Sequence, residues 1–236
     1  PVLPTSSNAL LASLIAAIPG IPVLAAAMCG PAPVSDPASD DILYDVFVEN
    51  LPTYYFGITY TKNTSVSNPA CVSYIKMRNN YDGSQFSEHT ELENVQVTAV
   101  HEFFHAIQFS YNCYERFWFM EATAVWSEDE LYNNVNDHYR YISSWFSNIN
   151  KSLDDESSHM YGSFIFFQYI DEHLGGPNTI RLCWEKSHEL ASPIQDNSIE
   201  SINAALSDLG SSFEETYLKM RIANKIMNTN AGLYSY

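Results

Sequence analysis

Residues 98–132 read TAVHEFFHAIQFSYNCYERFWFMEATAVWSEDELY, and this stretch decides the fold. Its apolar residues recur at helical spacing on both sides of a polar interruption at 112–116. This pattern predicts one helix at Leu92–Tyr111 and a second at Phe117–Tyr132. If the chain turns over the interruption and returns, the second helix packs against the first and their inward-facing polar residues meet.

The rest of the chain divides into a part with strand character and a part with helix character. Further helices are predicted at Asp137–Phe146, Tyr161–Leu174, Asn178–Ser187, Ile199–Leu209 and Ser212–Asn228. Runs of β-branched and aromatic residues predict strands at Asp41–Val48, Thr53–Tyr60 and Cys71–Met77, followed by a polar loop over 78–90. The predicted fold class is α+β, with a small β part at about 41–90 and a mainly helical part at about 91–236.

Residues 1–40 have a different composition from the rest. Residues 9–28 (ALLASLIAAIPGIPVLAAAM) are apolar over a membrane-spanning length, and a Pro-, Ser- and Asp-rich linker follows them. Pro19 and Pro22 interrupt the run and no Lys or Arg flanks it, which disfavours both a membrane span and an intact signal peptide. We interpret residues 9–28 as a buried segment or packing arm, with self-assembly or membrane contact as minor alternatives. Residues 41–236 are predicted to form one domain.

Charge and cysteines restrict the class of protein. The formal net charge is -17, with 28 acidic residues against 11 basic ones, which disfavours nucleic acid as a partner. The four cysteines include no C-x-x-C pair, so they predict either two disulfides, in any of three connectivities, or four buried free thiols. Sequons at Asn63 and Asn150 are glycosylation candidates. These features together favour a secreted or cell-surface protein.

The first motif that carries chemistry is His101-Glu-Phe-Phe-His105, or H-E-x-x-H, inside a predicted helix. Residues four apart lie on one helix face, so both imidazoles point to the same side and can share one Zn²⁺ ion. Glu102 lies beside that face and is not needed as a ligand. It is predicted to be the general base that takes a proton from a metal-activated water. The alternative is a helix with two unrelated histidines.

A third ligand is expected in the second helix, within Trp118-Phe-Met-Glu-Ala-Thr-Ala-Val-Trp126. Glu121 is surrounded there by apolar residues, and an unpaired buried carboxylate is costly, so it needs a partner such as a metal ion. Glu128 is two turns further along the same face, where it is predicted to orient a histidine ligand. A solvated surface position is the equally weighted alternative for Glu128.

These two motifs resemble those of the gluzincins, zinc metallopeptidases whose third ligand is a glutamate of a second helix. The W-x-x-E-[GA]-x-A pattern is similar to that of the aminopeptidase and hyicolysin branches. The resemblance implies a zincin-like fold, one zinc ion per chain held by His101, His105 and Glu121, and Glu102 as base. Two departures stand out: the spacing from His105 to Glu121 is shorter than in thermolysin, and Val125 occupies the position of thermolysin's acid that supports a ligand. The specific similarity covers about residues 98–132.

Peptidases of this kind usually add a tyrosine or histidine donor that stabilises the transition state. Tyr161 and His159, at the start of the predicted helix 161–174, are the candidates, although packing is the simpler role for Tyr161. The remaining histidines, which stand alone in the sequence, are expected at the surface: His89, His138, His173 and His188.

The sequence thus predicts a secreted zinc peptidase that acts on proteins or peptides, with an endopeptidase favoured over an aminopeptidase. A hydrolase of non-peptide amides is a related alternative. A different class is a surface or assembly module that has kept the zinc site, suggested by the apolar residues 9–28. The sequence contains no G-x-S-x-G motif and no phosphate-binding glycine loop.

Overall fold

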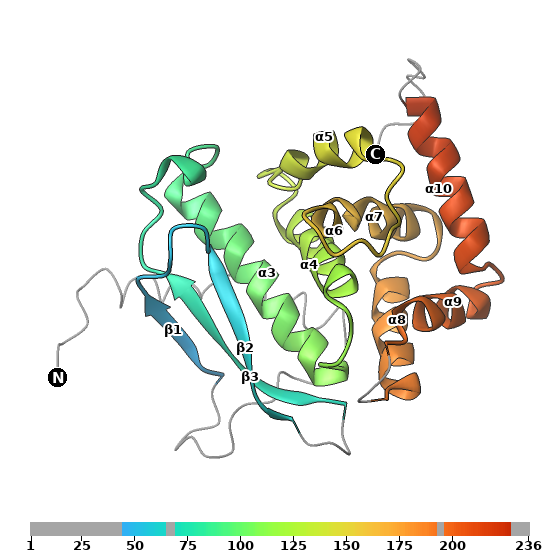
Figure 1. Cartoon of the computed structure of the whole chain (residues 1–236), viewed down its shortest axis with the longest axis horizontal. Helices are drawn as coiled ribbons and strands as arrows, with labels where there is room; N and C mark the ends of the chain where they lie inside the picture. Colours follow the sequence, from blue (N-terminus) through green and yellow to red (C-terminus); the bar gives the residue numbers. More distant parts are fainter. Residues whose placement is uncertain (1–43, 65–68, 193–195, 228–236) are drawn as a thin grey trace.

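The computed structural model describes residues 44–64, 69–192 and 196–227. A small sheet lies on one side of the molecule and the helices lie on the other, as Figure 1 shows. The predicted α+β class, with a three-stranded sheet in the N-terminal part followed by helices, is confirmed. The apolar residues 9–28 and Cys29 lie outside the described residues.

The sheet consists of β1 (Val46–Glu49), β2 (Gly57–Thr64) and β3 (Cys71–Arg78) in the order β1-β3-β2. The central strand β3 pairs in parallel with β1 and antiparallel with β2. Alternate residues of β3 are buried, so one face of the sheet packs on α3 through Ile75 and Met77. This packing places β2 beside the H-E-x-x-H helix.

Helix α3 (Glu91–Tyr111) contains the whole H-E-x-x-H motif. Its start is fixed by a capping box: the Glu93 backbone N–H donates to Thr90 Oγ1 over 3.3 Å, and the Thr90 N–H donates to Glu93 Oε2 over 2.8 Å. Helix α4 (Phe117–Tyr132) follows after a short turn. It runs back along α3, because Gln108 contacts Met120 whereas His101 contacts Glu128.

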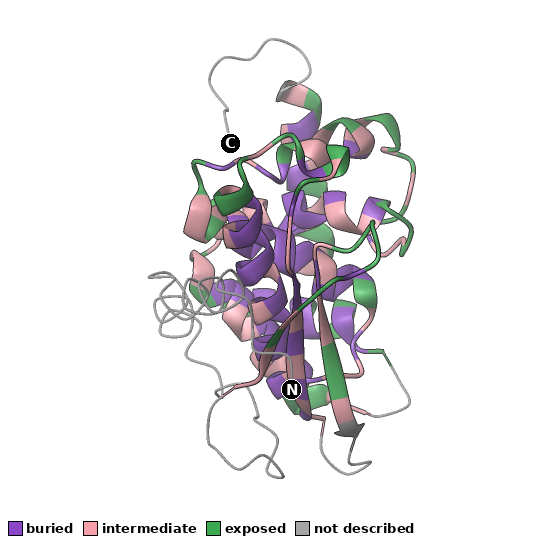
Figure 2. Cartoon of the chain, turned by 90° about the vertical axis from the view of Figure 1, so that its left-hand side faces the viewer, coloured by how far each residue is buried: buried purple, intermediate pink, exposed green. Residues whose placement is uncertain are grey.

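The remaining helices complete the hydrophobic core (Figures 1 and 2). They are α5 (Tyr139–Ser147), α6 (His159–Gly162), α7 (Phe164–His173), α8 (Pro177–Leu190), α9 (Ser198–Asp208) and α10 (Phe213–Met227), in addition to the short η1 (Ser84–Phe86) near the sheet. Helices α6 and α7 pack on α4, α5 packs on α6, α8 packs on α3, α7 and α9, and α10 packs on α7 and α9. The core is strongly aromatic, and Phe119 stacks on Trp184 with ring centroids 4.2 Å apart. Helix α4 is therefore held from several sides at once.

A disulfide joins the sheet to the helices. Cys71, at the start of β3, is bonded to Cys113 in the turn between α3 and α4. Cys183 is free and fully buried in the core, so the described residues form one disulfide where two were predicted, and the alternative of four free thiols is wrong. Among the described residues, no helix is long and apolar enough to cross a membrane.

Two predicted boundaries differ from the structure for identifiable reasons. The strand predicted at Thr53–Tyr60 begins only at Gly57, because the buried Arg78 side chain donates hydrogen bonds to the carbonyls of Leu51 and Tyr55 and holds that segment in a turn. The helix predicted at Tyr161–Leu174 is divided at Ser163, whose hydroxyl donates to the Leu153 carbonyl over 2.8 Å.

Candidate metal centre

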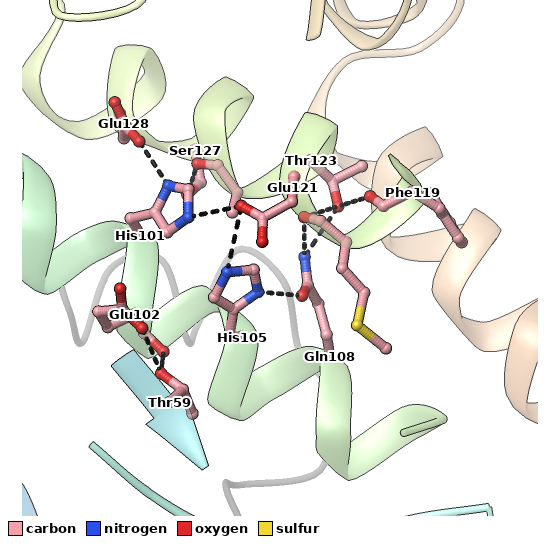
Figure 3. Close-up of polar contacts among 12 residues, drawn as sticks. Thr59, His101, Glu102, His105, Gln108, Phe119, Glu121, Thr123, Ser127 and Glu128 are labelled. Atoms are coloured by element: carbon pink, nitrogen blue, oxygen red, sulfur yellow. Dashed lines mark hydrogen bonds and ion pairs between the residues drawn. The ribbon is translucent and has the colours of Figure 1, made fainter. Parts of the chain in front are cut away.

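Three side chains from α3 and α4 converge on one point. The ligand atoms of His101, His105 and Glu121 all lie within 4.8 Å of one another, so the three residues can hold a metal ion (Figure 3). Glu121 Oε2 lies 3.1 Å from His101 Nε2 and 3.7 Å from His105 Nε2. Ligands about 2.0–2.1 Å from a tetrahedral ion are about 3.3 Å apart, so these separations fit one small ion.

The orientation of His105 is set by Gln108, one helical turn further along α3. The Gln108 amide nitrogen donates to the Met120 carbonyl over 2.8 Å and to Thr123 Oγ1 over 2.9 Å. The amide oxygen therefore faces His105, and it accepts a hydrogen bond from Nδ1 over 2.7 Å. With Nδ1 engaged by Gln108, Nε2 is the ring atom of His105 that faces Glu121.

His101 is oriented in the same way by Glu128. Its Nδ1 donates to Glu128 Oε1 over 2.6 Å, so Nε2 is again the atom that faces Glu121. Glu128 is 5% exposed, so its carboxylate is not the solvated surface group of the alternative interpretation. The structure thus brings together four predicted residues, namely His101, His105, Glu121 and Glu128. Each imidazole also has a hydrogen-bond acceptor at its Nδ1 atom, on the side away from Glu121 (Figure 3).

The charges of the cluster favour a cation between the three groups. Burial alone raises the pKa of Glu121, but the neighbouring His105 and His101 outweigh burial and hold that pKa well below its usual range. Burial alone lowers the pKa of His101, but hydrogen bonds from Nε2 and Nδ1 to Glu121 and Glu128 raise it well above its ordinary value. The site therefore stabilises positive charge at the point where both Nε2 atoms meet Glu121.

Glu102 lies on the side of α3 that faces the sheet, as Figure 3 shows. Its Oε2 accepts a hydrogen bond of 2.7 Å from Thr59 Oγ1 on β2, and its side chain is almost fully buried. Burial raises the pKa of Glu102, although the nearby His105 and His101 oppose this change. Gly57 leaves room for the side chain, because a Cβ atom there would lie 2.6 Å from Glu102 Cγ.

A cavity of about 290 Å³ opens beside these residues. His101, Glu102 and Tyr161 line it together, so the structure places Tyr161 in the same cavity as the predicted base. The Tyr161 ring stacks on Tyr141 with centroids 5.2 Å apart. Burial and the charges of nearby glutamates raise the pKa of Tyr161, so its phenol stays protonated and can donate a hydrogen bond.

The other predicted site residues lie apart from this cluster. Asn150 is exposed in the turn after α5, and Asn63 is in β2 with its side chain outside the described part of the structure. His159 is buried and stacks on Trp145, which does not fit a donor role at the metal. The surface placement of His138 is wrong, because it is only 7% exposed.

Sequence reasoning missed two residues of the site, Gln108 and Thr59. The role of Gln108 could have been predicted, because Gln108 lies three residues after His105 and thus on the same face of the helix. The role of Thr59 could not have been predicted: Thr59 reaches Glu102 only because β2 packs across α3, a contact between residues 43 apart in the sequence.

The comparisons with known proteins give one match. The family described as "Family of unknown function (DUF6055)" matches residues 75–204, which is more than half of the chain, so the chain belongs to this family. The matched region contains α3 and α4 with the whole candidate metal centre. No curated protein and no solved structure matches the chain.

Proposed function

We propose that this member of the DUF6055 family is a secreted zinc-dependent peptidase that hydrolyses internal peptide bonds of proteins or peptides. The observation that carries the proposal is the orientation of the two imidazoles. Glu128 and Gln108 accept the Nδ1 protons of His101 and His105, so both Nε2 atoms, which are the atoms that would bind a metal, face Glu121. A helix with two unrelated histidines would not need this arrangement.

The donor set favours zinc among the common metals. Two neutral imidazoles and one carboxylate are the three protein ligands of one well-known class of catalytic zinc site, which keeps a further position open. Calcium and magnesium prefer oxygen ligands throughout. Zinc bound here would supply a Lewis acid that polarises a carbonyl group and lowers the pKa of a water molecule.

The protein's own residues divide the remaining work. Glu102, with its raised pKa, accepts the proton of the attacking water and returns a proton to the leaving amine. Thr59 holds the Glu102 carboxylate in place through its 2.7 Å hydrogen bond. Tyr161, which lines the same cavity, donates a hydrogen bond to the oxygen on which negative charge develops.

A secreted location is supported by the disulfide between Cys71 and Cys113, since such bonds persist mainly in oxidising compartments. Exposed Asn150 is also accessible to glycosylation. The proposal of an endopeptidase, in preference to an aminopeptidase, is tested by comparing internally quenched peptides with aminoacyl-coumarin amides.

The test of the function combines metal content with turnover. We expect one zinc per wild-type chain by elemental analysis, no zinc in His105→Ala, and full zinc in Glu102→Gln with hydrolysis reduced by about 10²–10⁴-fold. Glu91→Gln, an exposed change on the same helix, is the matched control and leaves both readouts unchanged.

Two outcomes would contradict the proposal in different ways. Zinc bound by the folded wild type without cleavage of any unstructured protein substrate would favour the alternative, a surface or assembly module on this scaffold. Absence of zinc from folded protein purified without chelators would contradict the peptidase proposal and leave a surface or assembly module with a vestigial motif as the leading interpretation.

A further inference from the structure

A second cavity, of about 350 Å³, lies among the ends of α4, α5 and α7 and reaches Asn224 of α10. It is separated from the first cavity by the segment 133–140, which comprises the link between α4 and α5 and the first two residues of α5. Asp137 and Arg140 line the first cavity, whereas His138 and Tyr139 line the second. The second cavity takes no part in the proposed hydrolysis.

The charged groups that line this cavity are acidic. Asp129 of α4 and Glu172 of α7 contribute carboxylates, and neither Lys nor Arg is among the lining residues. Burial and the negative charge of Asp171 raise the pKa of Asp129, with no cation compensating. A carboxylate held in this setting without a cationic partner costs free energy, which a positively charged ligand would offset.

The neutral polar groups also present acceptors. His138 Nδ1 lies 3.4 Å from Asp129 Oδ1, so the imidazole stands beside the carboxylate, and a neutral imidazole keeps one ring nitrogen as an acceptor. Burial lowers the pKa of His138 to about 4, so the ring is neutral near pH 7. The Gln168 amide nitrogen donates to Glu172 over 3.1 Å, which leaves the Gln168 carbonyl oxygen without a partner.

Part of the lining of this cavity is apolar. Ile142 and Phe146 of α5 and Phe164 and Ile165 of α7 form this surface. The volume of about 350 Å³ falls within the range of about 300–1,000 Å³ that is usual for small-molecule pockets. A lining that combines acidic and acceptor groups with apolar side chains selects a ligand with a protonated head and an apolar body.

We propose that this second cavity binds a small primary amine with an aromatic or aliphatic body. The ammonium group donates to Asp129 and to the His138 acceptor, and the body packs on the Phe146 and Phe164 side. The proposal is independent of zinc and of hydrolysis.

The test uses 2-phenylethylamine as the ligand and two matched molecules, 2-phenylethanol and 3-phenylpropionate, in isothermal titration at 0.15 M NaCl. We expect the amine to bind at least tenfold more tightly than the alcohol and the anion not to bind. Asp129→Asn weakens amine binding at least tenfold, and Glu172→Gln, at an exposed position, weakens it by about two- to fivefold. Asp82→Asn, on a distant exposed loop, controls for attraction by the overall negative charge.

Thermal unfolding of each variant shows whether it is folded, and Glu172→Gln provides a second test if Asp129→Asn is not. Equal binding of amine and alcohol would overturn the proposal. The proposal would also be overturned if Asp129→Asn and Asp82→Asn weakened amine binding equally. That result would indicate attraction to the negative charge of the whole surface and not to this cavity.

Discussion

The replacement Gly57→Ala tests how closely β2 holds the proposed base. The added Cβ would lie 2.6 Å from Glu102 Cγ, 2.9 Å from Thr98 Cγ2 and 3.0 Å from Glu102 Oε1. Non-bonded carbon atoms prefer about 3.5–4.0 Å, so either the Glu102 side chain or the strand must move by about 1 Å. Thr59 can no longer hold the carboxylate where it lies now.

A displacement of about 1 Å at a catalytic group can reduce turnover by about 100-fold. We therefore expect hydrolysis of a quenched peptide to fall by about this factor in Gly57→Ala, with one zinc retained per chain. The free energy of unfolding, from urea titration, falls by about 1–3 kcal/mol, as for other insertions into packed sites.

Gly83→Ala is the matched control, because its added Cβ meets only the end of the exposed Gln85 side chain, which can move away. Gly57→Ala activity within about threefold of wild type, in a protein that is equally stable, would refute the reasoning. It would mean that Glu102 does not need its present position, and therefore that it is not the base.

Three further predictions concern the support of the site and the stability of the fold. Glu128→Gln weakens zinc binding by about 10–100-fold in chelator competition, because its imidazole partner loses a charged acceptor; unchanged affinity would argue against an orienting role. Replacing both Cys71 and Cys113 by serine opens a loop with a sequence separation of 42 and lowers the unfolding free energy by about 4 kcal/mol in urea titration. Burial raises the pKa of Glu115 from 4.5 to about 7, so its contribution to stability is present below pH 4.5 and is lost as the pH rises through 7. A glutamine at position 115 does not titrate, so in Glu115→Gln the decrease in unfolding free energy between low and high pH is expected to be smaller by about 3 kcal/mol. The urea midpoint of this variant would therefore change less with pH than that of the wild type.

The helices of the site were predictable because their information is local. The predicted helix Phe117–Tyr132 matches α4, and the predicted helix Leu92–Tyr111 differs from α3 by one residue at its start, because the capping box at Thr90 begins the helix at Glu91. The apolar periodicity and the polar turn at 112–116 are sufficient to predict the extent of both helices. The H-E-x-x-H spacing then places the two imidazoles on one face of α3 without further knowledge of the fold.

The parts that sequence reasoning missed depend on contacts between distant segments. The start of β2 is set by Arg78, whose hydrogen bonds to the carbonyls of Leu51 and Tyr55 replace those of a longer strand. The pairing of Cys71 with Cys113 follows from the way β3 packs beside the α3–α4 turn. Neither a propensity nor a spacing in one segment can report such an arrangement.

The segment 133–140 has a consequence for how two ligands would behave together. The same short stretch of backbone forms a surface of both cavities, with Arg140 on one side and His138 on the other. If a ligand in one cavity moves the segment 133–140, the shape of the other cavity changes as well. If the amine changed the affinity of a peptide, thermodynamic reciprocity requires the peptide to change the affinity of the amine by the same factor.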